Sequence, residues 1–143
     1  KKRFKNLENV SWHIGNAENL KFRSNFFDYY TISFGLRNTK DLNKSLKEAF
    51  RVLKPGGRFL CLEFSKISNP NLKLFYKNYS KLIPKIGKII VGKSEPYEYL
   101  VESIDKFINQ NQLIELMKKN GFENCKYRDL TGGVVSIHSG WKI

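Results

Sequence analysis

The sequence is poor in the residues that build metal sites and disulfides. Its 143 residues include two cysteines, Cys61 and Cys125, and two histidines, His13 and His138. Neither histidine has a cysteine, aspartate or glutamate at the spacing of metal ligands, so we expect no metal site. Two isolated thiols in apolar, strand-like runs are typical of buried filler residues in a reducing compartment.

Long apolar runs and biased segments are also missing. No stretch of about 18 apolar residues occurs, so we expect no segment that spans a membrane. The basic N-terminus, Lys1 to Lys5, lacks the apolar core of a signal peptide. The chain has no repeats and no low-complexity linker. Its content of 41% hydrophobic and 14% aromatic residues therefore predicts one folded domain over residues 1–143.

Negative charge is scarce relative to positive charge. The chain has 26 lysines and arginines against 13 acidic residues, a net charge of +13. The lysines are spread evenly, without an arginine-rich block or an RNA-binding aromatic motif, which favours a lysine-rich solvated exterior and no nucleic-acid partner. An anionic membrane surface is the next interpretation. A nucleic-acid binder would instead show affinity that falls steeply with salt.

The run from Asp28 to Asn38 organises the expected fold. Its first half, Asp-Tyr-Tyr-Thr-Ile-Ser-Phe, has the aromatic and β-branched residues of a buried strand. Gly35 breaks that pattern, and Arg37 and Asn38 follow it. A strand that ends in glycine and hydrogen-bonding side chains is typical of the ligand crevice of an open α/β sheet. We therefore place the edge of an active site at Ser33 to Asn38.

A helix and a second strand follow this run. Apolar residues recur at helical spacing over residues 41–53, and Thr39 or Asp41 can cap the start of this helix. A Lys-Pro-Gly-Gly turn ends it. Residues 58–64 form an apolar strand interrupted by Glu63, which is either a site residue or the partner of a nearby lysine. The order strand–helix–strand predicts an α/β, Rossmann-like domain.

The same patterns predict the remaining elements. The helices are expected over residues 70–83, 96–107 and 113–117, and the strands over residues 10–14, 125–130 and 134–138. A short apolar loop over residues 86–92 is expected near a membrane or in a lid.

Five motifs keep a fixed order and spacing along the chain. They are Gly-Asn-Ala-Glu-Asn-Leu, Thr-Ile-Ser-Phe-Gly-Leu-Arg-Asn, Arg-Val-Leu-Lys-Pro-Gly-Gly-Arg-Phe, Leu-Glu-Phe-Ser and Leu-Thr-Gly-Gly-Val-Val-Ser-Ile-His-Ser-Gly. Together they resemble the ubiquinone/menaquinone C-methyltransferases, the UbiE family, over essentially the whole chain. The variants Cys-Leu-Glu-Phe-Ser and Ile-His-Ser-Gly resemble the mitochondrial and alphaproteobacterial branch.

The resemblance implies a class I methyltransferase fold that uses S-adenosyl-methionine as its cofactor. The implied reaction moves a methyl group to a ring carbon of a prenylated quinol. By that likeness Asn16 and Ala17 hold the adenine edge, and Ser33 lies against the cofactor. Arg37 and Asn38 are the implied catalytic residues, where the methyl donor and the ring meet. Without the resemblance, Arg37 would be read as part of a surface salt bridge.

A helical segment over about residues 66–108 is expected to cap the substrate. Within it Tyr79, Tyr97 and Tyr99 are candidates for the quinone pocket, and ordinary core packing is as good an interpretation of each. The substrate is expected to be a benzoquinol or a naphthoquinol. A peripheral membrane surface, a homodimer and a quinone-biosynthesis complex are the other expected partners.

The family pattern has an N-terminal part for which this chain has no counterpart. That part contains a glycine-rich turn and an acidic strand end for the cofactor, and no G-x-G-x-x-G motif occurs here. We therefore expect the C-terminal part of a longer enzyme, inactive alone, with weak cofactor binding and an open strand edge at residues 28–34. In a eukaryote it would act at the matrix side of the mitochondrial inner membrane. In a bacterium it would act in the cytoplasm or at the inner membrane. A non-catalytic scaffold of a quinone-biosynthesis complex is the alternative function.

Overall fold

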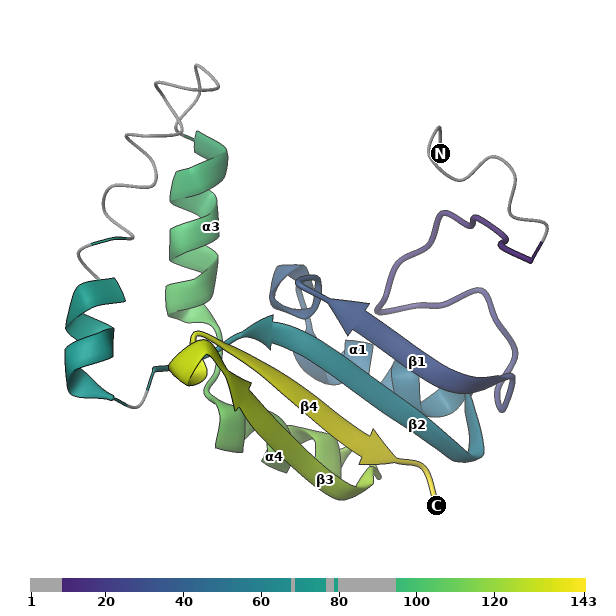
Figure 1. Ribbon diagram of the computed structural model, residues 1–143. Coiled ribbons are helices and arrows are strands. Elements are labelled where there is room, and N and C mark those ends of the chain that lie inside the picture. The colour runs from purple at the N-terminus through teal and green to yellow at the C-terminus, as the bar shows by residue number, and fades with distance from the viewer. Residues whose placement is uncertain (1–8, 68, 77–78, 80–94) are drawn as a thin grey trace.

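The computed structural model describes residues 9–67, 69–76, 79 and 95–143 (Figure 1). These residues contain a four-stranded mixed sheet in the order β1-β2-β4-β3. The strands are β1 (Phe27–Ser33), β2 (Leu53–Phe64), β3 (Glu123–Leu130) and β4 (Val135–Trp141). β1 and β2 are parallel, whereas β4 is antiparallel to both of its neighbours. The architecture agrees with the predicted α/β class.

The predicted helix between the two parallel strands is present. α1 (Leu42–Val52) begins after Asp41, whose Oδ1 accepts a hydrogen bond from the backbone N of Lys44 at 3.0 Å. Asp41 is therefore the N-cap, and Thr39 instead donates its hydroxyl to the carbonyl of Leu36. This helix carries the chain from the end of β1 back to the start of β2, as the strand–helix–strand pattern requires.

The sequence predicts a separate turn at the Lys-Pro-Gly-Gly sequence of residues 54–57. In the structure these residues lie within β2. Pairing with β1 jumps from Phe27↔Leu53 to Tyr29↔Arg58, so β2 bulges between these pairs. Gly56 adopts a positive φ of 78°, which the bulge requires and glycine tolerates. The strand therefore begins earlier than the apolar pattern predicts.

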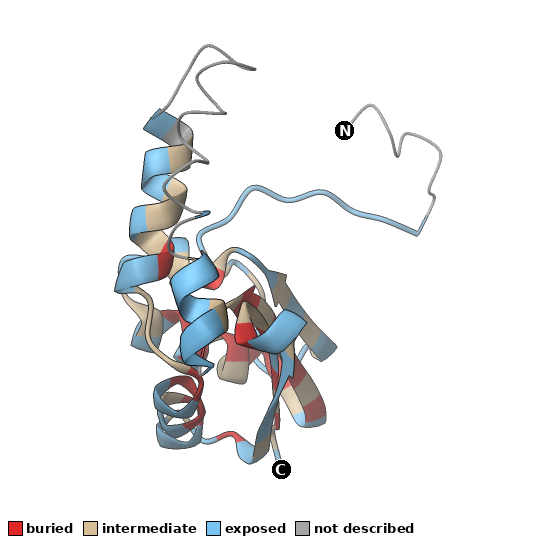
Figure 2. Cartoon of the chain, turned by 60° about the vertical axis from the view of Figure 1, so that its left-hand side comes forward, coloured by how far each residue is buried: buried red, intermediate tan, exposed pale blue. Residues whose placement is uncertain are grey.

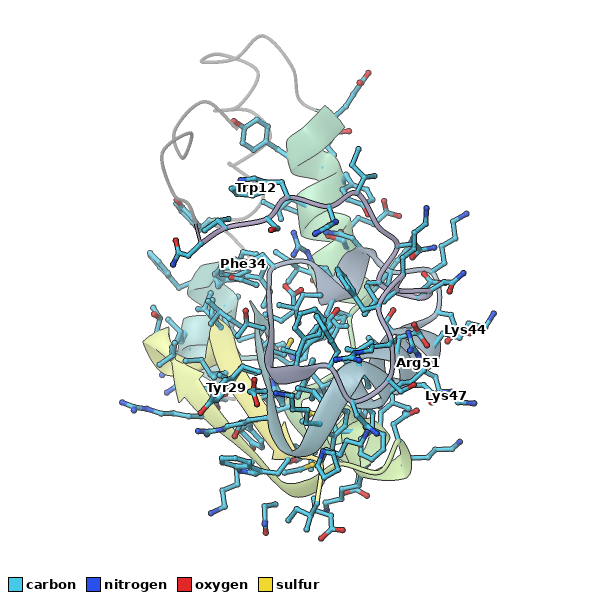
Figure 3. All side chains as sticks on the ribbon, turned by 90° about the vertical axis from the view of Figure 1, so that its right-hand side faces the viewer. Trp12, Tyr29, Phe34, Lys44, Lys47 and Arg51 are labelled. Atoms are coloured by element: carbon cyan, nitrogen blue, oxygen red, sulfur yellow. The ribbon has the colours of Figure 1, made fainter. Side chains whose placement is uncertain are left out.

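α1 and α4 (Gln110–Lys119) cover one face of the sheet. The hydrophobic core lies between these two helices and the sheet. The ring centroids of Phe50 and Phe59 each lie 5.2 Å from that of Phe122, which joins α1, β2 and the end of α4. Figure 2 shows the buried residues gathered at this interface. On the outer side of α1, Lys44 and Lys47 project into solvent (Figure 3).

Cys61 is part of this core. It is fully buried on β2, and burial raises the pKa of its thiol to about 12. Cys125 is half-buried, and burial raises the pKa of its thiol too. A thiol that stays protonated at neutral pH is a poor nucleophile, so Cys61 has the filler role that the sequence predicts.

The strand predicted over residues 10–14 is wrong. These residues have no regular secondary structure, and Ile14 is 96% exposed. Figure 2 shows them as exposed chain running away from the body of the protein. A strand needs a neighbouring strand to satisfy its backbone groups, and none of the strands described pairs with this segment. Among the described residues, no strand pairs with the outer edge of β1 either, as the sequence predicts.

The C-terminal half follows the predicted order with longer elements. α3 (Glu95–Lys106) and α4 replace the helices expected over residues 96–107 and 113–117. β4 runs on to Trp141, past the predicted end at His138, because it pairs with β2 on one side and β3 on the other. The short helix η3 (Thr131–Gly133) joins β3 to β4.

The segment that leads to α3 is described only in part. Residues 70–76 are helical, as predicted. The rest of the helix expected to residue 83, apart from residue 79, lies outside the described residues, as does the loop expected over residues 86–92. Figure 1 shows the helix of residues 70–76 and α3 together at one end of the sheet. That end holds the carboxyl ends of β1 and β2.

Candidate functional site

The candidate site begins where β1 ends. Phe34 has a φ of 52°, a left-handed conformation that is uncommon for an aromatic residue. The chain then enters the short helix η2 (Leu36–Asn38), and the Phe34 carbonyl accepts two hydrogen bonds from it. Arg37 Nη1 donates at 2.6 Å and Asn38 Nδ2 at 3.3 Å. In this strained turn the Phe34 carbonyl thus accepts hydrogen bonds from both predicted catalytic side chains, Arg37 and Asn38.

Arg37 forms a buried ion pair with Glu63 near the end of β2. Arg37 Nη1 lies 2.9 Å from Glu63 Oε1, and the two side chains are 8% and 1% exposed. The backbone N of Arg37 donates to Glu63 Oε2, and the backbone N of Phe64 donates to Oε1. The partner of Glu63 is therefore Arg37 and not a lysine. The salt bridge that the sequence allowed for Arg37 is therefore present, but it is buried and does not lie at the surface.

α3 completes the surroundings of the guanidinium. Arg37 Nε donates to Ser103 Oγ at 3.2 Å, and Arg37 Cζ lies 5.2 Å from the centre of the Phe64 ring. Arg37 also lines a pocket of about 270 Å³ between η2 and α3. Its Nη2 makes no hydrogen bond to any described residue. Nη2 is thus the one guanidinium nitrogen of Arg37 without an acceptor among the described residues.

Asn38 is tied to α3 from the other side. The hydroxyl of Tyr99 donates to Asn38 Oδ1 at 3.1 Å, and Tyr99 lines the same pocket as Arg37. The structure thus brings together Arg37, Asn38 and Tyr99, which the sequence had placed in one site. Tyr79 is half-exposed and Tyr97 half-buried, and neither lines this pocket.

The predicted adenine-binding residues lie in a separate turn. Asn16 Oδ1 accepts a hydrogen bond from the backbone N of Glu18, and the carbonyl of Asn16 accepts one from Asn19. Ala17 lines a pocket of about 410 Å³ together with residues 13–15 and 20–22. Glu18 connects this turn to the Arg37 loop, because its Oε1 accepts from the backbone N of Lys40 at 2.7 Å. The two pockets are neighbours but not one cavity.

The residues of this turn fit the adenine end of S-adenosyl-methionine. Asn16 is exposed and its amide nitrogen donates no hydrogen bond to a described residue, so it can serve a heterocycle. An added Cβ at Gly15 would meet nothing within 4 Å, so a flat ring can approach the backbone there. Ser33 ends β1 and is exposed. Glu63, the buried carboxylate at the end of β2, is already paired, so the described residues offer the ribose no acidic partner there.

Two side chains of the Arg37 network could not be assigned from the sequence. Ser103 lies 66 residues from Arg37 along the chain, and a serine inside a helix gives no local signal. Glu63 did give a signal, as a charge inside an apolar strand, but the pattern could not name its partner. Contacts between distant segments need the fold.

The described part of the chain shows neither a metal centre nor a membrane span. No group of three or more potential metal ligands lies together in the described residues. Among the same residues, no helix has the length and apolar character needed to cross a bilayer.

The fold is shared with solved S-adenosyl-methionine-dependent methyltransferases. A member of that class from Thermotoga maritima matches with a TM-score of 0.64 at 23% identity, over 90% of this chain and 62% of that chain. The phosphoethanolamine N-methyltransferase 2 of Haemonchus contortus, solved with S-adenosylhomocysteine, gives 0.59 at 16% identity, over 89% and 36%. These likenesses confirm the predicted fold class.

The sequence comparisons name the family. Residues 1–142 match the ubiE/COQ5 methyltransferase family, and the chain belongs to it. A Rickettsia prowazekii protein named ubiquinone/menaquinone biosynthesis C-methyltransferase UbiE is 56% identical over 96% of this chain and 56% of its own length. The protein of that name from Brucella abortus is 51% identical over 96% and 51%. The resemblance read from the motifs is confirmed, and the chain spans about half the length of these relatives.

Proposed function

We propose that this chain is the C-terminal part of an enzyme that transfers a methyl group from S-adenosyl-methionine to a ring carbon of a prenylated quinol. The family and the names of its bacterial relatives support the reaction class and the quinone substrate. The observation that carries the proposal is the Arg37 group. A buried guanidinium, with one nitrogen that bonds none of the described residues, lies at the carboxyl ends of two parallel strands, where sheets of this type bind ligands. Residues 66–108 would cap the substrate.

The chemistry asks for a nucleophilic ring carbon. Loss of a proton from a ring hydroxyl creates it, and the resulting oxyanion needs a hydrogen-bond donor. Arg37 Nη2 can supply that bond from a position fixed by Glu63, Ser103 and the Phe34 carbonyl. A guanidinium has only donors and no acceptor, so Arg37 cannot take the proton itself, and we assign that step to a water that Arg37 and Asn38 orient.

The cofactor, when bound, supplies an electrophilic methyl group whose sulfonium leaving group needs no acid. The protein therefore acts mainly by positioning. Asn38 and Tyr99 hold one wall of the pocket through their hydrogen bond. Asn16, Ala17 and Ser33 would bind the cofactor. Tyr79 and Tyr97 would line the quinone pocket in the complete cap.

The 143 residues alone should bind S-adenosyl-methionine weakly. The described residues offer a partner only for its adenine end, so we expect a Kd of about 1 mM or weaker by calorimetry. The same titration with a full-length relative is the control, and it checks that the S-adenosyl-methionine used is competent to bind. Micromolar affinity of this chain would contradict the proposal that most of the cofactor site lies in the N-terminal part of the enzyme.

A membrane surface is the proposed route of the apolar substrate. Leu74 and Phe75 are 62% and 69% exposed on the helix of residues 70–76, and the net charge of +13 favours anionic lipid. The double variant L74E/F75E should lower cosedimentation with phosphatidylglycerol vesicles by about tenfold or more, because it removes two apolar anchors. The double variant I14E/I143E, at two other exposed apolar residues, adds the same two charges and is the matched control. Equal loss in both variants would show that added charge alone weakens binding.

The relatives are bacterial. For a bacterial source, the proposed location is the cytoplasm or the periphery of the inner membrane. A mitochondrial location, on the matrix side, would follow only for a eukaryotic source. A homodimer or a quinone-biosynthesis complex is compatible with the open edge of β1.

A transfer assay tests the function against the scaffold alternative. The full-length enzyme is incubated with S-adenosyl-methionine labelled in its methyl group and with a demethylated prenyl quinol. We expect label on a ring carbon of the quinol. A scaffold would bind the quinol and leave the label in the cofactor.

A further inference from the structure

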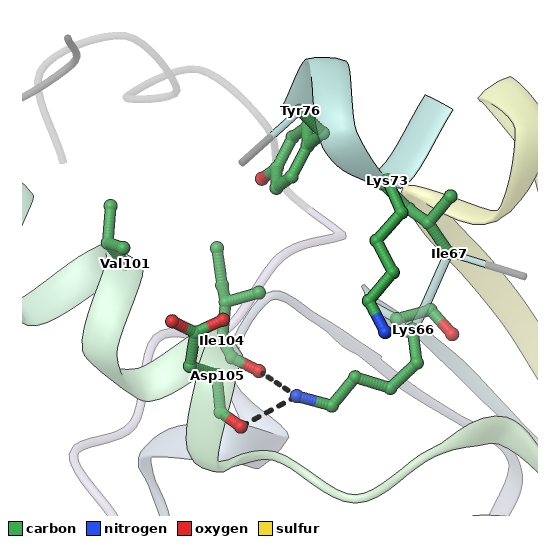
Figure 4. A pocket seen from close by; sticks show the side chains of 8 residues that line it. Lys66, Ile67, Lys73, Tyr76, Val101, Ile104 and Asp105 are labelled. Atoms are coloured by element: carbon green, nitrogen blue, oxygen red, sulfur yellow. Dashed lines mark hydrogen bonds between the residues drawn. The ribbon is translucent and has the colours of Figure 1, made fainter. Parts of the chain in front are cut away.

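A second pocket lies on the far side of α3 from Arg37. It has a volume of about 320 Å³ and opens between the helix of residues 70–76 and α3 (Figure 4). Its lining residues are Ser65, Lys66, Ile67, Lys73, Tyr76, Val101, Ile104 and Asp105. Apart from Ser65, they all belong to the segment of residues 66–108 that the sequence predicts as the substrate cap. The volume is at the lower end of the range of about 300–1,000 Å³ for ligand pockets, so it suits part of a ligand.

Three charged side chains line this pocket, and two of them, Lys73 and Asp105, are exposed. The Lys66 ammonium donates to the carbonyls of Ile104 and Asp105 at 2.9 and 2.6 Å, where it neutralises the C-terminal end of α3. Burial raises the pKa of the Tyr76 hydroxyl, which therefore stays uncharged.

The inner wall is apolar. Ile67 and Ile104 are each 9% exposed, and Val101 lies one helical turn before Ile104 on the same face of α3. A pocket with this wall favours a hydrocarbon chain over a hydroxylated ring.

The pocket lies near the Arg37 site at the end of β2. Ser65 follows Glu63 by two residues, about 7 Å of extended chain. α3 contributes to both sites from opposite faces, with Ser103 bonded to Arg37 and Ile104 in the wall of the second pocket. A flexible chain attached to a ring near Arg37 would have to pass the end of β2, beside Ser65, to reach this pocket.

We propose that this pocket binds the first part of the substrate's isoprenoid tail. The proposal rests on the proposed function, which supplies a quinol with such a tail. An acyl chain of a lipid shares the same chemistry, so the test must separate these two sources.

The test fills the pocket with a larger side chain and compares substrates with and without an isoprenoid tail. In the full-length enzyme, Val101→Trp places a large side chain in the pocket. Glu98→Trp places the same group at an exposed position of α3 and is the matched control. We expect Val101→Trp to lower kcat/KM for a geranylated quinol by about tenfold or more, with little change for the tail-less quinol. Glu98→Trp should leave the ratio of the two substrates unchanged.

A second arm does not need turnover. Geraniol is titrated into the wild-type enzyme while the methyl resonances of Val101 and Ile104 are followed by NMR. Saturable shifts are expected in the wild type and not in Val101→Phe, a milder filling variant for use if the tryptophan variant is unstable. Shifts without any quinol methylation would refute the proposed function and leave an apolar-chain site.

Three results would each overturn the tail site. The first is an equal loss of kcat/KM for geranylated and tail-less quinols in Val101→Trp with its melting temperature preserved. The second is geraniol binding without any effect of tail length on turnover, which would assign the pocket to a lipid chain. The third is the absence of both geraniol shifts and tail dependence.

Discussion

Arg37→Ala is expected to lower kcat of the full-length enzyme by about two to three orders of magnitude, the usual loss when one fixed donor to a developing oxyanion is removed. Arg37 Nη2 makes no hydrogen bond to a described residue, whereas its other nitrogens are held by Glu63, Ser103 and Phe34. The affinity for S-adenosyl-methionine should change little, because the turn that contains Asn16 lies outside this pocket. Steady-state kinetics and calorimetry measure the two effects separately.

Lys40→Ala is the matched control for this variant. Lys40 lines the same pocket, and its described bond to Glu18 uses only the backbone N. Its loss should therefore cost far less activity than the loss of Arg37. Arg37→Lys keeps the charge but cannot reproduce the forked set of bonds, so it should recover little activity. Full activity of Arg37→Ala, or equal losses of kcat and cofactor affinity, would contradict the role of Arg37.

Glu63→Ala is expected to destabilise the protein by about 3–5 kcal/mol. Glu63 is 1% exposed, and its removal leaves the Arg37 guanidinium without its anionic partner in a buried site. Two backbone N–H groups, those of Arg37 and Phe64, also lose their acceptor. Urea denaturation measures the free energy of unfolding.

Two variants separate the buried pair from ordinary loss of charge. Asp28→Asn weakens an exposed pair, since Asp28 is 71% and Lys54 45% exposed, and should cost under about 1 kcal/mol. The double variant R37L/E63L should be more stable than Glu63→Ala, because it leaves no unpaired buried charge. A cost for Glu63→Ala no larger than that for Asp28→Asn would contradict the buried pair.

The local part of the fold could be predicted from the sequence. β1 has a dense run of aromatic and β-branched residues, and α1 has a clear apolar stripe with Asp41 as its cap. These signals depend on neighbours within a few residues. The strand predicted over residues 10–14 failed for the opposite reason, because its stability depends on a pairing partner that the pattern cannot supply.

The sequence could predict which residues lie at the end of β1 in the site. It could not predict which distant residues they contact. The ending of β1 in glycine, arginine and asparagine pointed to residues 33–38, and the structure places Arg37 and Asn38 together there. The ion pair to Glu63 and the bond to Ser103 join segments 26 and 66 residues apart. Their partners are set by sheet register and by the packing of α3, which no local pattern encodes.

The position of the substrate ring relative to Arg37 is the most direct test of the proposed mechanism. A crystal structure of the full-length enzyme with S-adenosylhomocysteine and its quinol would measure it. We predict a ring hydroxyl oxygen about 3 Å from Arg37 Nη2, within hydrogen-bond distance. A ring bound away from η2, with Nη2 facing no atom of the substrate, would contradict the assignment of Arg37 as the catalytic donor.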